Sequence, residues 1–125
     1  MKARIGIIPE KVLRQRMLDI AKGKLKPEPD EPRVWFSSLN ALGQALSNEN
    51  IALLRIMDAE KPQTMTELAS LSGRQLSNLS ATLKMLSRYG FVSLEKQGNC
   101  VQPKALFTDF EIIIDPSVGE AHRAA

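Results

Sequence analysis

Two leucine-patterned segments, joined through a single glycine, constrain the fold of this chain more than any other feature of its sequence. The shorter segment covers residues 64–72, and we expect its Leu68 and Leu71 to face inward. Gly73 then permits a sharp turn into the longer segment, residues 74–89. On a helical wheel, four leucines of this longer segment fall within an arc of roughly 80°: Leu76, Leu79, Leu83 and Leu86. The pattern therefore predicts two consecutive helices that share one core.

A hairpin pattern follows the second of these helices. Gly90 suits the left-handed end of a helix, and residues 91–97 and 100–104 have the composition of two strands. Gly98 and Asn99 between them are typical of a two-residue turn, and Pro103 favours an edge strand. A short helix, a glycine turn, a longer helix and a hairpin, in this order, predict a winged helix-turn-helix.

Polar residues mark the starts of the helices in the middle of the chain. Thr64 followed by Glu67 forms a capping box, in which Thr64 accepts from the first turn and Glu67 reaches back. Two further helices are predicted over residues 37–47 and 47–61, the first with Leu39, Leu42 and Leu46 on one face. Their expected caps are Ser37 or Ser38 for the first and Ser47 or Asn48 for the second.

Both ends of the chain add smaller elements to this core. We expect a strand over residues 3–9, a helix over residues 10–22 that ends near Gly23, and a proline-rich extended connector over residues 24–34. A last strand is predicted over residues 107–115, with a frayed tail over residues 117–125. The fold class is therefore mainly α with small β, an α+β winged helix-turn-helix with an N-terminal strand-helix arm and a C-terminal strand.

These patterns divide the chain into three parts. We expect residues 1–33 to form the arm and connector and to serve dimerisation or partner binding, and residues 34–104 to form the winged helix-turn-helix domain. Residues 105–125 hold the last strand and the tail. The 125 residues suit one domain of ordinary size.

The outer face of the helix predicted over residues 74–89 points to nucleic acid. The segment contains no Asp or Glu, and small side chains lie in the middle of its outer face with cations at both ends. Small side chains let a helix backbone approach base edges, and Arg and Lys reach bases or phosphates. Residues 61–104 together hold six Lys and Arg against two Asp and Glu. This basic segment favours DNA over a leucine-spaced core helix with a neutral polar exterior.

Individual contacts follow from the chemistry of each side chain. Gln75 and Asn78 match adenine, and Arg74 matches guanine. Phosphate or water contacts are assigned to Ser77 and Ser80, and Lys84 and Arg88 supply positive charge. At the tip of the hairpin, Lys96 and Asn99 suit contacts with the DNA backbone or minor groove.

Composition gives no support to several other classes of protein. A single cysteine, Cys100, fits a reducing cytoplasm and gives no internal disulfide, and no apolar run is long enough to span a membrane. Cys100 as a redox sensor is the alternative to Cys100 as a small packing residue. The lone His122 lies in the predicted tail, and no residues have the spacing of a catalytic triad, a metal site or a phosphate loop. We therefore expect no catalytic residues, no metal and no cofactor, and a cytoplasmic protein that is not an enzyme.

Two long stretches carry a family resemblance: "VWFSSLNALGQALSNENIALLRIM" and "MTELASLSGRQLSNLSATLKMLSRYGFVSLEKQG". They resemble the MarR-like winged helix-turn-helix regulators, and more closely a group of short prokaryotic DNA-binding proteins, some of them antitoxin-like. The resemblance implies a transcriptional regulator, a repressor that acts as a homodimer on a palindromic operator. Relatives often carry a basic residue where this chain has Ala81, so no contact is transferred to that position.

Partners follow from the segments outside the winged helix. The strand and helix of the arm, Trp35, Phe36 and the last strand carry much apolar surface. We expect them to form a homodimer, and the alternative is that they fold back and cover this surface within one chain. The second function considered is an antitoxin-type protein that neutralises a small toxin through one arm. A winged helix that binds only protein is the third.

Overall fold

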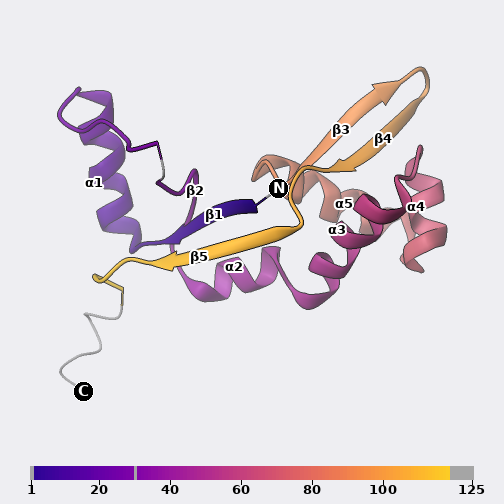
Figure 1. Ribbon diagram of the computed structural model, residues 1–125, viewed down its shortest axis with the longest axis horizontal. Helices are drawn as coiled ribbons and strands as arrows, with labels where there is room; N and C mark the ends of the chain where they lie inside the picture. The colour runs from indigo at the N-terminus through magenta and orange to yellow at the C-terminus, as the bar shows by residue number, and fades with distance from the viewer. Residues whose placement is uncertain (1, 30, 119–125) are drawn as a thin grey trace. The chain divides into compact units, whose positions relative to one another are not determined.

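The structure is a computed structural model that describes residues 2–29 and 31–118. Five helices and five strands lie within this part of the chain (Figure 1), which confirms the expected α+β class. In chain order they are β1 (Lys2–Ile7), α1 (Glu10–Ala21), β2 (Val34–Phe36), α2 (Leu39–Ala45), α3 (Asn48–Glu60), α4 (Met65–Ser72), α5 (Leu76–Arg88), β3 (Val92–Gln97), β4 (Cys100–Ala105) and β5 (Asp109–Ile114).

The elements form two compact units. The central unit is the continuous segment Gln44–Asp109, which holds α3, α4, α5 and the hairpin of β3 and β4. The terminal unit combines Lys2–Gly43 with the described residues from Phe110 to Val118. The division therefore falls within α2 and at the start of β5.

A three-stranded sheet in the order β2-β1-β5 organises the terminal unit. β1 and β2 pair in parallel, with Ile5 opposite Val34 and Ile7 opposite Phe36. The arrows of β1 and β5 also point the same way in Figure 1, and the Asp115 N–H donates to the Ile7 carbonyl at 2.8 Å. β1 therefore lies in the middle of a parallel sheet, which agrees with its buried Ile5 and Ile7.

β2 is the element that the sequence analysis missed, because its three residues are too short for a period-2 pattern. Its Trp35 lies against Gly6 of β1, where an added Cβ atom would be 2.2 Å from Trp35 Cζ3. The Arg16 guanidinium lies 5.3 Å from the centroid of the Trp35 ring and also pairs with Glu31. These contacts attach the proline-rich connector to α1 and β1, so part of the apolar surface of the arm is covered within one chain.

Side-chain caps begin α3 and α4 where the sequence predicted them. Ser47 Oγ accepts from the Asn50 N–H at 3.2 Å, and Thr64 Oγ1 accepts from the Glu67 N–H at 3.0 Å. Glu67 does reach back, but its Oε2 accepts from the Gln63 N–H at 3.2 Å, one residue before the predicted position. Gly73 ends α4 with a φ of 74°, as expected for a left-handed cap.

The core of the central unit is built from the leucine pattern with two corrections. Leu68 of α4 and Leu79, Leu83 and Leu86 of α5 are fully buried, together with Leu54 of α3. Leu71 was predicted to face inward, and it is 43% exposed. Leu76 was placed in the buried arc, and it is 49% exposed because α5 begins only at that residue, before its first turn meets the neighbouring helices.

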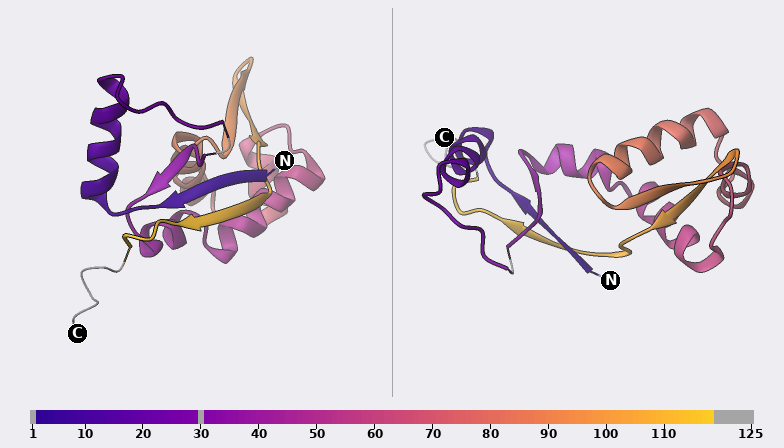
Figure 2. Two further views of the ribbon diagram at one scale, coloured as in Figure 1. Left: turned by 60° about the vertical axis from the view of Figure 1, so that its left-hand side comes forward. Right: turned by 90° about the horizontal axis from the view of Figure 1, so that it is seen from above.

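The hairpin is confirmed in detail. β3 and β4 pair antiparallel from Val92 opposite Ala105 to Gln97 opposite Cys100, so Gly98 and Asn99 form the two-residue turn. Gly98 has a φ of 62°, as such a turn requires. The hairpin projects beyond the helices of the central unit, as Figures 1 and 2 show.

The helix of the arm departs from a simple amphipathic pattern. α1 has no buried residue, and Val12, Met17 and Leu18 are 39%, 53% and 48% exposed. The last strand, β5, forms as predicted and ends before Pro116. The predicted tail lies, from residue 119 onwards, outside the described residues, and so does His122.

Candidate nucleic-acid interface

α5 presents one continuous polar face to solvent. Its buried face is formed by Leu79, Leu83 and Leu86, and it packs against α4 and β3. The exposed positions on its other side are the small or cationic residues that the sequence singled out: Ser77, Asn78, Ala81, Lys84 and Arg88. Ser80 is half-buried at the edge of this face. The exposed face therefore has no acidic side chain along its whole length.

The N-terminus of α5 differs from those of α3 and α4. Gln75 is its N-cap residue, but no side chain caps the helix, whereas Ser47 and Thr64 cap the other two. Without a cap, the backbone N–H groups of the first turn have no side-chain acceptor in the described chain. The partial positive charge of this helix end is therefore open to an anion, and Gln75 and Ser77 lie exposed beside it.

Arg74 makes an intramolecular contact that the sequence did not predict, and its predicted guanine contact stays a prediction. It was placed on the helix as a guanine contact, but it precedes α5 and its Nη1 donates to Asn50 Oδ1 at 3.0 Å. Asn50 is 7% exposed, and its Nδ2 donates to the Ala45 carbonyl at 2.9 Å. One donor of the Arg74 guanidinium therefore holds the turn before α5 to the start of α3.

Asn50 was not predicted from the sequence, because no local pattern connects it with Arg74, 24 positions later. The only sequence feature that points to Asn50 is its place on the inner side of an amphipathic helix. A buried amide there needs a hydrogen-bond partner, but the sequence does not say which. Through Asn50 and Arg74, the end of α2, the first turn of α3 and the turn before α5 are tied together. This network positions the start of α5, where Gln75, Ser77 and Asn78 are exposed.

The tip of the hairpin carries the remaining predicted residues. Lys96 and Asn99 are exposed, as is the neighbouring Gln97, whose Nε2 donates to Gln102 Oε1 at 3.4 Å. Lys104 pairs with Glu95 across the hairpin at 3.1 Å, so its charge is compensated. Within residues 2–29 and 31–118, Lys84, Arg88 and Lys96 make no ion pair. Three cations therefore remain available to an anionic partner.

Other candidate sites have less support in the geometry. Cys100 is exposed beside the hairpin turn, so it does not pack in the core. No group of three or more His, Cys, Asp or Glu side chains among the described residues has the arrangement of a metal site. In the same part of the chain, no helix has the length and apolarity needed to cross a bilayer.

The central unit is also the region with a recognisable family. The family model described as HVO_A0114 matches residues 45–112. The chain belongs to the HVO_A0114 family. The match includes α3, α4, α5 and the hairpin, so the family is defined by the unit that carries the candidate interface. None of the curated proteins and none of the solved structures matches the chain.

Proposed function

We propose that α4, the Gly73 turn, α5 and the hairpin form a winged helix-turn-helix, and that this HVO_A0114 family member is a sequence-specific DNA-binding transcriptional regulator. The observation that carries the proposal is the exposed face of α5, which is acid-free and lies opposite its three buried leucines. In this assignment α5 enters the major groove, and the hairpin contacts the adjacent backbone or minor groove.

Each exposed residue then has a definite task. Asn78 reads a base edge, and Ser77 and the uncapped start of α5 contact a phosphate. Lys84, Arg88 and Lys96 neutralise phosphates, which makes binding strongly dependent on salt. Ser80 serves as a phosphate contact at the edge of the face, and Arg74 positions the helix through Asn50. The protein acts as a repressor, as a homodimer on a palindromic operator.

Genomic-fragment selection followed by anisotropy titrations tests this function. Lys84→Ala should weaken binding to all sequences and lower the salt slope by about 1, because one phosphate contact is lost. Asn78→Ala should instead relax the preference at one base position, by about 1–3 kcal/mol of discrimination. Lys22→Ala is the matched control, since it removes an exposed lysine that lies just after α1 in the terminal unit.

Two results would contradict the proposal. If Lys22→Ala weakened DNA binding as much as Lys84→Ala, the affinity would depend on the net charge of the protein and not on the position of Lys84. An unchanged sequence preference in Asn78→Ala would show that Asn78 does not read a base.

The exposed apolar side chains of α1 favour a second candidate, an antitoxin-type protein that neutralises a small toxin and regulates its own operon. Val12, Met17 and Leu18 are all at least 39% exposed, and Val12 lines an open surface depression with Ile8 and Leu25 whose other lining residues are polar or charged. Co-expression with the product of an adjacent small reading frame tests this candidate. Met17→Asp should abolish co-purification and leave DNA binding unchanged.

A further inference from the structure

β5 is an edge strand with an unusually apolar open side. It ends the order β2-β1-β5, and no further strand of the described chain lies beyond it. Ile112, Ile113 and Ile114 are 48%, 40% and 50% exposed, although isoleucine is among the residues most often buried. Asp109–Ile114 contains no Pro, Lys or Arg, and its only charged side chains, Asp109 and Glu111, lie in its first half, so Ile112–Ile114 is left without a charged side chain.

Some backbone N–H and C=O groups of β5 point away from β1 and can pair with another strand. The Asp115 N–H points toward β1, where it donates to the Ile7 carbonyl. Because backbone groups alternate along a strand, the N–H and C=O groups of Ile112 and Ile114 point away from β1. The outer edge therefore offers two residues with both donor and acceptor in position for another strand.

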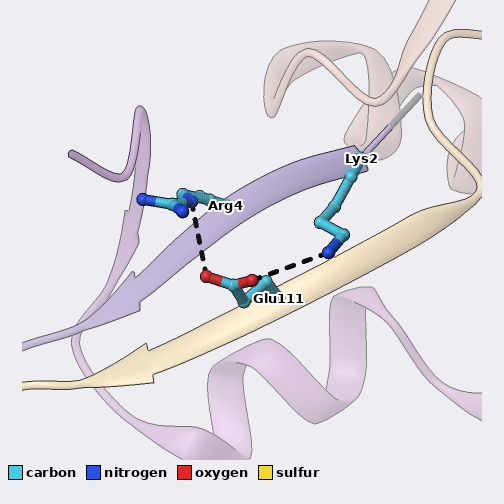
Figure 3. Close-up of polar contacts among 3 residues, drawn as sticks. All are labelled: Lys2, Arg4 and Glu111. Carbon is cyan, nitrogen blue, oxygen red and sulfur yellow. Dashed lines mark ion pairs between the residues drawn. The ribbon is translucent and has the colours of Figure 1, made fainter. Parts of the chain in front are cut away.

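The acidic side chains of β5 and of the residue after it allow the possible pairings of two copies to be compared. Glu111 is held by two cations of β1, with Lys2 Nζ at 3.7 Å and Arg4 Nε at 3.3 Å from its carboxylate oxygens (Figure 3). Asp109 and Asp115 make no ion pair with the described residues. Ser117 donates to the Asp115 carboxylate from its hydroxyl and its backbone N–H, which lowers the pKa of Asp115 and keeps it charged.

A two-fold axis allows only antiparallel pairing in which outward-facing residues lie opposite each other. Centred on Ile112, such a pairing places Asp109 opposite Asp115, and like charges directly opposite are destabilising. Centred on Glu111, it places the two glutamates together and leaves Ile113 opposite Asp109. A pairing centred on Ile113 brings the three isoleucines of each copy together. It also places Asp115 opposite Glu111 of the other copy, where Lys2 and Arg4 balance the charges of both acids.

We propose that the outer edge of β5 pairs antiparallel with the same edge of a second copy, centred on Ile113, so that two three-stranded sheets join into one of six strands. Ile112 then lies opposite Ile114 of the second copy, and Asp115 faces the cluster of Glu111, Lys2 and Arg4. The pairing rests on the homodimer of the proposed function and specifies its interface. It buries the apolar edge and satisfies the outward backbone groups of Ile112 and Ile114.

Disulfide trapping tests this interface in the full chain, with Cys100→Ser as the background. Facing residues in a non-hydrogen-bonded pair have Cα atoms about 4.5 Å apart, within the range of a disulfide. Ile113→Cys should therefore form a covalent dimer on mild oxidation, seen on a non-reducing gel. Ile112→Cys and Ile114→Cys are the matched controls and should each cross-link at least tenfold more slowly, since their own copies lie about 7 Å apart or more.

Three results would overturn the interface. Faster cross-linking of Ile112→Cys would show a different register, and a dimer without cross-linking at any of the three positions would place the interface elsewhere. Light scattering that gives only a monomer at micromolar concentration would remove the dimer. DNA binding is measured separately, so a protein that cross-links at Ile113 but binds no genomic fragment would overturn the proposed function alone.

Discussion

Single residues show why chemistry at a site is hard to assign from spacing alone. Arg74 has the side chain and sequence position of a base contact, and one donor of its guanidinium bonds Asn50, 24 residues earlier, which local sequence does not reveal. Exposure separates it from Asn78 and Lys84, which lie on the same predicted face but remain open to solvent. The chemistry that each side chain can perform was therefore predictable from the sequence, whereas the long-range hydrogen bond of Arg74 to Asn50 was not.

Asn50→Ala tests the network beneath the start of α5. The change leaves the Ala45 carbonyl and the Arg74 guanidinium without their partner, so the free energy of unfolding should fall by about 1–3 kcal/mol. Urea denaturation followed by circular dichroism measures this change. Asn48→Ala, at an exposed position of the same helix, should alter stability by less than about 0.5 kcal/mol. Equal midpoints for the two variants would show that the network contributes nothing.

At the scale of elements, local chemistry predicted most of the central unit. Caps at Ser47 and Thr64, the left-handed Gly73 and the Gly98-Asn99 turn all act within a few residues, and all were confirmed. The three-residue β2 was missed because its place is fixed by pairing with β1 and not by its own pattern. The exposure of Leu71 and Leu76 was also missed, since helical angle alone does not say where a neighbouring helix ends.

Two leucines of α5 provide a direct comparison of the buried and exposed ends of one pattern. Leu83→Ala removes a fully buried side chain and should cost about 2–5 kcal/mol of stability. Leu76→Ala, at a position that is 49% exposed, should cost less than about 1 kcal/mol. Thermal or urea unfolding of both variants measures the difference. A loss of stability in Leu76→Ala as large as that in Leu83→Ala would show that Leu76 packs in the core, as the sequence suggested.

At the scale of the whole molecule, the sequence and the structure divide the chain differently. Composition placed boundaries after residues 33 and 104, whereas contacts divide the chain between residues 43 and 44 and between residues 109 and 110. The difference arises because β5 pairs with β1, more than 100 residues away, which no local signal reveals. The order of the three-stranded sheet was unpredictable for the same reason.

A symmetric dimer makes a prediction about its operator. If the proposed homodimer places its two copies of α5 in successive major grooves, the half-sites should lie about one helical turn apart, 10–10.5 base pairs, or a multiple of it. Inserting about five base pairs between them should reduce affinity to that of a single half-site, and inserting about ten should restore part of it. Anisotropy titrations on the three duplexes measure this dependence. Equal affinities would show that each copy binds alone.

The discontinuous terminal unit has a consequence for the order of events during synthesis. β1 leaves the ribosome first, but its second neighbour, β5, follows only after the whole of Gln44–Asp109 has been translated. The segment that carries the candidate interface is therefore complete while the sheet still lacks a strand. Under the two proposals above, the nascent chain would therefore complete its DNA-binding surface before it completes the strand edge through which two copies would pair.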